Sequence, residues 1–396
     1  MTQPADTEAS GPGIVEPGPA LEPDRIARYS RQLMLPGFGE RAQRRLVAAR
    51  VLVIGAGGLG SALVPALAGA GVGTIGIADD DIVELSNLHR QLSHGVADIG
   101  RAKVDSLAET VAAIDPAITV TRIVERVTAE NLPGLLADYD LLVDGSDNFA
   151  TRYLANDAAE LAGKPMVWGS ILRFHGQVGV AWRGHGPTFR DLFPAPPPAD
   201  EALSCELGGV LPSLCTAIGS LMATEVIKLI AGIGEPLLGR VLFYDALTAR
   251  TREIGYAVDE TRAELTGLDD YERLCGTAPD AGVSISAAEL LRRRRAGERM
   301  LLLDVREPDE AARRRIPGSA LLPVGRIDAG EAPQTALPVV VYCEKDPRSR
   351  RAVAALRERG HDAVYVVGGI RSFVAVGGET ESAVDTSAVR GEGALA

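Results

Sequence analysis

The chain has 396 residues, which is too long for one ordinary hydrophobic core, so we expect two domains. Hydrophobic residues make up 46% and charged residues 24%, as in a soluble globular protein, and the net charge of -12 argues against a nucleic-acid-binding surface. No apolar run approaches a membrane span, no signal-like N-terminus is present, and the four cysteines are scattered, so we expect a cytoplasmic, reducing location and no membrane contact.

The first part of the chain predicts a tail followed by a short helix. Residues 1–22 are rich in Pro, Gly, Ala and Glu and have little to bury, which predicts disorder. Residues 24–32 have the pattern of a polar helix that carries Arg31. From the residues alone, Arg31 is most simply a solvated charge.

A strand, a glycine turn, a helix and a second strand come next. The apolar, β-branched residues 51–54 are typical of a buried strand. Gly55, Gly57 and Gly60 follow at the Gly-x-Gly-x-x-Gly spacing, which allows a tight turn, close approach of phosphate oxygens and packing of the helix on the strand. The strand at 74–78 ends in Asp79, an acid suited to ribose hydroxyls. Together these features predict a nucleotide site at a helix N-terminus.

Strands and helices continue to alternate, which predicts a parallel sheet with helices on both faces. The expected elements are a helix at 101–114, a strand at 118–124, a helix at 129–137, a strand at 139–145, and strands of a mixed extension at 165–172 and 176–182. Asp147 and Asn148, like Gly57 and Asp79, follow a strand end. We therefore expect them to converge on one crevice at the carboxyl ends of the strands.

The remaining chain contains a long loop, a linker and a second α/β domain. Residues 184–209 hold several prolines and no periodicity, which predicts a functional or mobile loop carrying Cys205. A helix at 212–230, with Cys215 as a packed residue, and a strand at 240–246 complete the first domain. The other expected segments are a charged linker at 259–282, a second domain at 283–378 and a loose tail at 379–396.

The residues after Asp79 distinguish this sequence from a dinucleotide dehydrogenase, in which the acid closes the motif. Here the chain runs through Asp80 and Asp81 to Ser86-Asn87-Leu88-His89-Arg90-Gln91, and then to Lys103 and Asp147-Asn148. In order and spacing this combination resembles the ThiF/MoeB family, adenylyltransferases that activate ubiquitin-like sulfur-carrier proteins. The resemblance covers about residues 28 to 255. It implies a Rossmann-like adenylation domain at 23–258, ATP and Mg²⁺ as cofactors, and a carrier ending in Gly-Gly as partner.

The resemblance also implies a role for individual residues. Arg90 and Lys103 match phosphate-contact positions, where cations ease the attack of a carboxylate on a polyanion. Asp147 matches the magnesium-associated aspartate, and Arg31 matches an arginine given to the partner subunit's nucleotide site, which implies a homodimer. The expected nucleotide-binding residues are Gly55, Gly57, Gly60, Asp79, Ser86, Asn87, Leu88, His89, Arg90, Lys103, Asp147 and Asn148.

Some residues keep alternative interpretations. Asp80 is expected at the surface, and Asp81 either behind the site or near the metal. Asn148 could simply cap the next helix. Cys205 matches a family cysteine that attacks the acyl-adenylate or forms an acyl-disulfide, although Glu206 beside it opposes a thiolate.

Many family members bind a structural zinc through two Cys-x-x-Cys pairs. The matching positions here are Thr188 and Asp191, and Glu272 and Cys275. One thiolate cannot build a tetrahedral zinc site, so we predict no zinc and interpret Cys275 as an inert remnant. Other packing must then hold the linker on the domain.

The second domain resembles a rhodanese. The resemblance rests on residues 303–307, 316–320, 343–349 and 367–370. Cys343 ends a strand and opens a loop that leads into a helix N-terminus and is closed by Arg348, an arrangement that stabilises a thiolate or persulfide. Pro347 removes one N–H donor from this loop, and the acids Glu344 and Asp346 disfavour thiosulfate. A cysteine-desulfurase persulfide is therefore at least as suitable a sulfur donor.

The sequence predicts adenylation of a sulfur carrier followed by sulfur transfer from a Cys343 persulfide, with Cys205 assisting. The first alternative is adenylation alone, with a silent rhodanese domain. An NAD-dependent dehydrogenase explains residues 55–79 but not the later motifs, and a non-catalytic scaffold predicts disruption of Arg90, Lys103 and Asp147, all of which are present. The carrier and its pathway, whether molybdopterin, thiamine, cysteine or tRNA thiolation, stay open.

Overall fold

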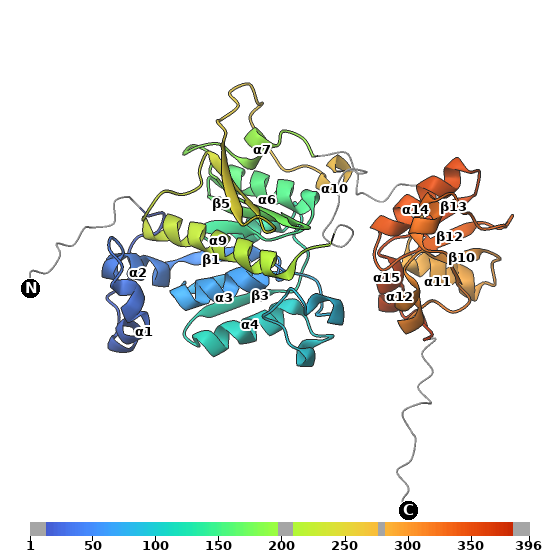
Figure 1. Ribbon diagram of the computed structural model, residues 1–396, viewed down its shortest axis with the longest axis horizontal. Helices are drawn as coiled ribbons and strands as arrows, with labels where there is room; N and C mark the ends of the chain where they lie inside the picture. Colours follow the sequence, from blue (N-terminus) through green and yellow to red (C-terminus); the bar gives the residue numbers. More distant parts are fainter. Residues whose placement is uncertain (1–12, 197–208, 276–281, 383–396) are drawn as a thin grey trace, which may run out of the picture. The chain divides into compact units, whose positions relative to one another are not determined.

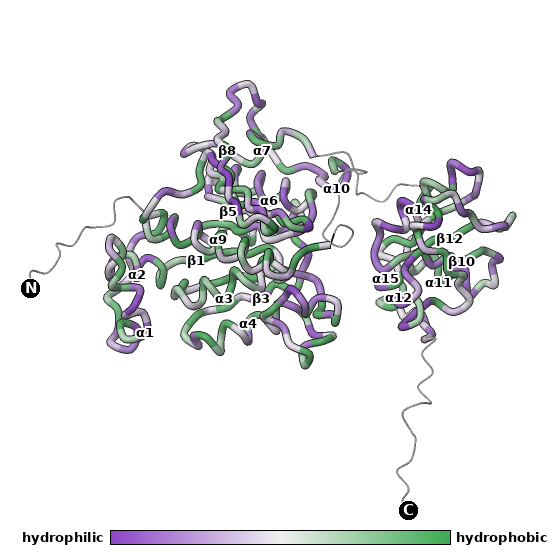
Figure 2. The backbone as a smooth tube through the Cα atoms, in the orientation of Figure 1, coloured by the Kyte–Doolittle hydropathy of each residue, from purple (hydrophilic) through white to green (hydrophobic). Residues whose placement is uncertain are grey.

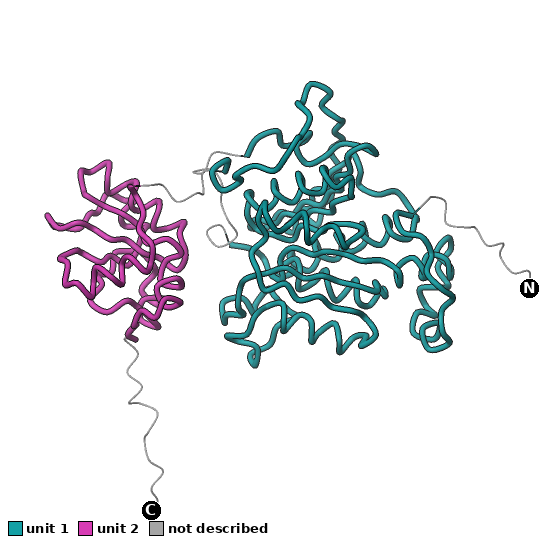
Figure 3. The backbone as a smooth tube through the Cα atoms, turned by 180° about the vertical axis from the view of Figure 1, so that it is seen from behind, with its two compact units in different colours: residues 1–277 teal, residues 278–396 magenta. Residues whose placement is uncertain are grey.

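The computed structural model describes residues 13–196, 209–275 and 282–382. The chain divides into two compact units, residues 1–277 and 278–396, which Figure 3 distinguishes by colour. Each unit has its own sheet, and every hydrophobic cluster of buried described residues lies within one unit.

The first unit is built on a mixed eight-stranded sheet with the order β3-β2-β1-β4-β5-β6-β7-β8. Its strands are β1 Arg50–Ile54, β2 Thr74–Ala78, β3 Thr119–Ile123, β4 Leu141–Asp144, β5 Met166–Leu172, β6 His175–Ala181, β7 Arg240–Asp245 and β8 Arg250–Gly255. The first five pair in parallel and the last three are antiparallel.

Helices cover both faces of this sheet (Figure 1). They are α1 Pro23–Leu33, α2 Gly39–Ala48, α3 Gly60–Ala70, α4 Lys103–Ile114, α5 Leu132–Ala137, α6 Phe149–Leu161, α7 Phe189–Leu192, α9 Pro212–Ala231 and α10 Tyr271–Leu274. Successive β1 side chains point to opposite faces: Val51 and Val53 pack with α2, α3, α4 and α9, whereas Leu52 and Ile54 pack with α5 and α6. Burial on both faces is why β1 has no polar alternation.

Helix α9 corrects one expectation. Its 20 residues are long and apolar enough to cross a membrane, with a mean hydropathy of 1.6, so the prediction that no run reaches this length is wrong. However, 61% of this apolar window is buried inside the protein. Leu214, Ile218 and Met222 belong to the same cluster as α3, and Figure 2 shows hydrophobic residues along both α9 and α3. The composition of α9 is that of a core helix.

Two segments predicted to be disordered or to act as linkers are packed on the first unit. In the N-terminal segment, residues 13–22, Val15 is buried and the Ile14 N–H donates to Leu229 O at 3.1 Å, contrary to the predicted disorder. In the segment 259–275, Tyr271 and Cys275 are buried. Few apolar residues suffice in each case because an existing hydrophobic surface receives them.

The second unit is a smaller, fully parallel α/β structure with the strand order β11-β10-β12-β13-β9. The strands are β9 Ser284–Ile285, β10 Leu301–Asp304, β11 Ala320–Leu321, β12 Val339–Tyr342 and β13 Ala363–Val366. The helices are α11 Ala287–Arg295, α12 Pro308–Arg313, α13 Val324–Asp328, α14 Pro347–Glu358 and α15 Gly369–Ala375. The predicted loose tail begins with an ordered contact, because Glu381 pairs with Arg315 through backbone and side chain. The α/β prediction, a Rossmann-like mixed sheet with a smaller α/β domain, is confirmed.

Candidate active sites

The nucleotide motif lies where the strand order of the first sheet reverses. From β1 the chain moves outward to β2 and β3, and then returns to the other side of β1 as β4. In sheets of this kind, ligands usually bind at such a reversal, beyond the carboxyl ends of the strands. Residues 55–60, Asp79 and Asp147 all follow strands that end at this edge.

The three glycines of the turn meet different surroundings. Gly55 has a φ of +95°, which favours glycine. A Cβ at Gly60 would lie 2.0 Å from Gly55 O, so the start of α3 can approach the end of β1 only without a side chain. Among the described residues, a Cβ at Gly57 would meet only Gln91 Nε2, at 3.6 Å. Space beside Gly57 is thus open for a ligand.

Ala56, in the middle of the turn, is held through both of its backbone groups. Its N–H donates to Asp79 Oδ2 at 2.7 Å, and its carbonyl oxygen lies 3.0 Å from His94 Nε2. Because a carbonyl can only accept, Nε2 carries the proton and Nδ1 accepts from Ser106 Oγ at 2.9 Å. Burial lowers the pKa of His94 and raises that of Asp79, the latter opposed by Lys103. The turn is rigid before any ligand arrives.

The segment after β2 places its polar residues around a short 3₁₀ turn, Leu85–Asn87. Asn87 is buried and its Oδ1 accepts the Glu84 N–H at 3.1 Å, while Ser86 and His89 are exposed. Arg90 Nη1 donates to Ser86 O at 2.9 Å and lies 2.9 Å from His89 Nε2. Leu88 is half-buried. The Arg90 guanidinium is thus positioned by residues of the same turn.

Lys103 begins α4 and is almost fully buried. Its Nζ lies 3.0 Å from Asp81 Oδ2, and its N–H donates to Asp81 O at 3.0 Å. Asp81 is thus the counter-ion of Lys103, the residue that the sequence predicts to contact phosphate. Asp80 is exposed, as expected.

The loop after β4 is supported from below by an ion pair that the sequence analysis missed. Arg152 Nε donates to buried Asp144 at 2.9 Å, and Arg152 Nη2 donates to Ser146 O at 3.0 Å. Asn148 Oδ1 accepts the Thr151 N–H at 2.8 Å and so caps α6. Asp147 is exposed, with its carboxylate free of hydrogen bonds to described residues. In the sequence, this pair could have been suspected only from an Arg that stands eight residues after the Asp at the end of a predicted strand.

Helix α1 is anchored on one side and presents Arg31 on the other. Asp115 accepts from Tyr29 OH at 2.8 Å and pairs with Arg25, and Arg28 Nε lies 3.6 Å away. Arg31 is exposed, and no hydrogen bond or ion pair joins it to the described part of the chain. Its guanidinium is thus available to another molecule.

The four positions that match the zinc cysteines have other partners. Thr188 and Asp191 form a capping box for α7, Glu272 lies 2.9 Å from Arg126, and burial raises the pKa of Cys275 to about 11. Among the described residues, no group of three or more His, Cys, Asp or Glu side chains could hold a metal ion. This donor set does not suit zinc.

Arginines instead connect the segment 259–275 to the first unit. Arg262 Nε donates to Asp191 at 3.1 Å and Arg262 Nη2 donates to Glu160 at 2.9 Å. Asp157 accepts two bonds of 2.7 Å from Arg190 and one of 2.8 Å from Tyr271 OH. Charged cross-links therefore provide the packing that the sequence analysis required in place of a metal.

The cysteines of the first unit contribute less to the described site. Cys205 lies outside the described residues. Cys215 is buried in α9, where burial raises its pKa, and it contacts the glycine turn because a Cβ on Gly58 would lie 3.0 Å from its Sγ. This is the packed residue that the sequence predicted.

In the second unit, Cys343 follows β12 and opens the loop that leads into α14. Its thiol is 1% exposed, and its Sγ lies 3.4 Å from Ser349 Oγ. Because Ser349 OH also donates to Asp346 O at 2.9 Å, the thiol donates to Ser349 and the hydroxyl must turn to serve a thiolate. Burial raises the pKa of Cys343, whereas the Ser349 and Lys345 N–H groups and Arg348 lower it. Burial prevails, so the pKa of Cys343 is raised and its surroundings do not favour the thiolate that the sequence suggested.

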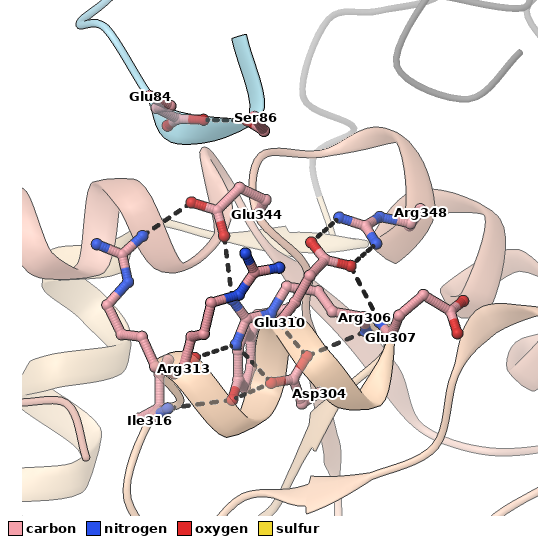
Figure 4. Close-up of polar contacts among 12 residues, drawn as sticks. Glu84, Ser86, Asp304, Arg306, Glu307, Glu310, Arg313, Ile316, Glu344 and Arg348 are labelled. Carbon is pink, nitrogen blue, oxygen red and sulfur yellow. Dashed lines mark hydrogen bonds and ion pairs between the residues drawn. The ribbon is translucent and has the colours of Figure 1, made fainter. Parts of the chain in front are cut away.

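Charged side chains surround this loop (Figure 4). Arg348 forms a two-bond pair with Glu310 of α12, with Nη2 2.8 Å from Oε1. Glu344 accepts from Arg306 at 3.0 Å and from Arg314 at 2.8 Å. The roles of Glu310 and Arg314 were not predicted, because only their position in the fold brings them to Cys343.

Comparisons with known proteins identify the family of each unit. The ThiF family model matches residues 29–263, more than half of the chain, and the rhodanese-like domain model matches residues 286–375. A probable adenylyltransferase/sulfurtransferase MoeZ of Mycobacterium tuberculosis is 48% identical over 91% of this chain and 95% of its own length. The adenylyltransferase and sulfurtransferase MOCS3 of Sus scrofa is 37% identical over 91% and 88%.

Solved structures show the same fold. A crystal structure of E. coli MccB with MccA-N7isoASN has a TM-score of 0.55 at 21% identity and covers 61% of this chain and 75% of that one. Another, of E. coli MccB with ATP, has a TM-score of 0.54 at 19% identity, covering 62% and 75%. From its family match, its relatives and its fold, the chain belongs to the ThiF family and carries a rhodanese-like domain as its second unit.

Proposed function

We propose that this protein binds ATP, adenylates the C-terminal glycine of a ubiquitin-like sulfur-carrier protein, and then transfers sulfur to it as a thiocarboxylate. The main observation behind this proposal is that one chain contains two sites. The first is the hydrogen-bonded glycine turn, with Lys103 and Asp147 at the same sheet edge, and the second is the loop that begins with Cys343. The match to adenylyltransferase/sulfurtransferase relatives over nine-tenths of the chain supports this pairing.

In the first step the carrier carboxylate attacks the α-phosphorus of ATP and pyrophosphate leaves. The opened space at Gly57 admits the phosphates, and Lys103 and Arg90 offset their charge. Asp147 is proposed to hold Mg²⁺, since its exposed carboxylate is the hard oxygen ligand that Mg²⁺ prefers. Bound Mg²⁺ would neutralise phosphate charge. On binding, Lys103 is expected to be shared between Asp81 and the nucleotide.

In the second step a persulfide on Cys343 attacks the acyl carbon and AMP leaves. The carrier is then joined to Cys343 through an S–S bond. A further thiolate attacks the Cys343 sulfur and forms a disulfide with it, and the electron pair of the broken S–S bond leaves with the carrier thiocarboxylate. Cys205 is proposed to assist, because it matches the family cysteine. Exposed Arg31 supports a homodimer in which it serves the partner's nucleotide site. We further propose a cytoplasmic location and no zinc.

Intact mass spectrometry of a Gly-Gly-ended carrier tests this function. The carrier is incubated with the protein, ATP, Mg²⁺ and a persulfide donor, with Cys343→Ala, Cys205→Ala and, as a matched control, Cys275→Ala. We expect a thiocarboxylate from the wild type and the control but not from Cys343→Ala. If an adenylate forms but never gains sulfur, the protein catalyses adenylation without sulfur transfer. If the carrier is unchanged, the enzyme assignment is wrong and a scaffold role is favoured.

A further inference from the structure

We propose that Glu310 and Glu344 determine the sulfur-donor specificity of the Cys343 site. By neutralising the arginines around the loop, they exclude dianionic donors such as thiosulfate and leave the site to a cysteine persulfide. This inference rests on the proposed sulfur-transfer role of Cys343.

The first neutralised charge is that of Arg348. Its guanidinium meets Glu310 through two parallel bonds, the strongest geometry for such a pair, and both side chains are largely shielded from solvent. Arg348 lies close enough to Cys343 to affect its pKa, and Glu310 raises the pKa of Arg348 itself. The arginine that closes the loop therefore offers little net charge to an incoming anion.

The second and third neutralised charges are those of Arg306 and Arg314, which both pair with Glu344, the residue after Cys343. One carboxylate oxygen accepts from Arg306 and the other from Arg314. Arg306 is also bound to buried Asp304 through Nε at 3.0 Å and Nη2 at 2.7 Å (Figure 4). Three arginines thus face three carboxylates.

The balance of charge decides which donor the site can hold. Thiosulfate is a dianion, and sulfite, its leaving group, keeps the full charge, so both need unneutralised cations in a site with little water. A cysteine persulfide carries at most one charge, and its leaving group is a single thiolate that can take up a proton. The remaining charges of the loop, Lys345 and Asp346, have opposite signs.

The reaction with a persulfide needs no additional oxidant. The Cys343 thiolate attacks the outer sulfur of R–S–SH, a new S–S bond forms at Cys343, and the donor's S–S bond breaks. The electron pair leaves with R–S⁻, so one persulfide is consumed and one is made.

The test compares two donors on three variants of the full chain. Glu310→Gln and Glu344→Gln remove one charge each at nearly unchanged side-chain shape, and each variant keeps one of the two oxygens that accept from the arginines. Glu331→Gln is the matched control, because its ion-pair partner Arg326 contacts neither Glu310 nor Glu344. Loading of Cys343 is followed by intact mass with thiosulfate or with glutathione persulfide, and thermal unfolding checks that each variant is folded.

We expect both test variants, but not the control, to raise the loading rate from thiosulfate relative to glutathione persulfide by about tenfold. This gain should shrink as salt is added, because freed charges are screened. Equal loading rates from both donors in the wild type, or an unchanged ratio of the two rates in the variants, would overturn this inference but not the proposed sulfur transfer. Loading from neither donor, with ATP–pyrophosphate exchange intact, would overturn sulfur transfer and this inference together.

Discussion

Cys343 shows how one residue can be placed for nucleophilic chemistry and yet be uncharged at rest. Its neighbours include two N–H donors, a hydroxyl and Arg348, but a thiol that is 1% exposed loses more by desolvation than these donors return. Since Glu310 already pairs with Arg348, the arginine cannot offset the loss. The nucleophile is thus formed only when the pH or a bound donor favours the thiolate.

This environment predicts the pH dependence of sulfur loading. Because burial raises the pKa of Cys343 above its ordinary value, the thiolate fraction, and with it the loading rate, should still be rising at about pH 9. Ser349→Ala should lower the rate by about tenfold, since it removes the hydroxyl that can turn toward the thiolate. Rates from intact mass between about pH 6 and pH 9.5 give the profile.

A profile that levels off near neutral pH would contradict this expectation. It would mean that the donors around Cys343 outweigh burial, as the sequence alone suggested. Cys275→Ala serves as the control and should leave the profile unchanged, because Cys275 lies in the other unit.

At the scale of elements, arginine cross-links hold the segment 259–275 on the rest of the first unit. Arg262 joins Asp191 and Glu160, whose side chains are almost fully buried. Its removal would leave buried Asp191 without an ion-pair partner in the described part of the chain and Glu160 with the more distant Arg183, at 3.9 Å, which is costly even where the intact pair contributes little. The attachment of the segment 259–275 should therefore depend on Arg262 and not on a metal.

Arg262→Ala is expected to destabilise the first unit by about 2–4 kcal/mol. Arg273→Ala is the matched control, because Arg273 is 84% exposed and, in the described part of the chain, forms its ion pair with exposed Asp270; it should change stability by less than about 0.5 kcal/mol. Denaturant unfolding of both variants measures the difference. Incubation with EDTA should leave the wild-type transition unchanged; a chelator-sensitive transition would show that a metal contributes.

The elements also show what the sequence could reveal. Strands β1 and β4 and helix α9 were predictable because their side chains bury in a regular pattern. Strand β8 was missed: all six of its residues are exposed, so it has no apolar alternation and exists because β7 pairs with it. Helix α2 was also missed.

The sites also contain residues that can be recognised from a local sequence pattern and residues that depend on the fold. Motif residues such as Gly57, Lys103 and Cys343 could be picked out from the order and spacing of the motifs and from the family resemblance that these carry. Arg152 and His94 act through partners 8 and 38 positions away, which only the folded chain brings together. The pairing of Glu310 with Arg348 likewise spans 38 positions.

At the scale of the whole molecule, both units use the same solution for different chemistry. Each places its reactive loop after a central parallel strand, β1 or β12, and directly before a helix, α3 or α14. Buried strands fix the loop at one end and the helix fixes it at the other. Two chemistries can then evolve in one chain without sharing a core.

Separate cores predict separate unfolding. The clusters around β1 and those around β12 contain no common residue, so calorimetry of the full chain should resolve two transitions. Leu356→Ala removes a fully buried side chain of the second unit and should lower only that unit's transition, by about 10 °C or more. Leu63→Ala, equally buried in the first unit, should lower only the other.

The ligand dependence identifies which transition belongs to which unit. A non-hydrolysable ATP analogue with Mg²⁺ should raise the transition that Leu63→Ala lowers, because a ligand stabilises the fold that binds it. The transition lowered by Leu356→Ala should not respond. A single transition that moves with both substitutions and with the nucleotide would mean that the units unfold as one, and that sulfur transfer and adenylation are coupled through stability itself.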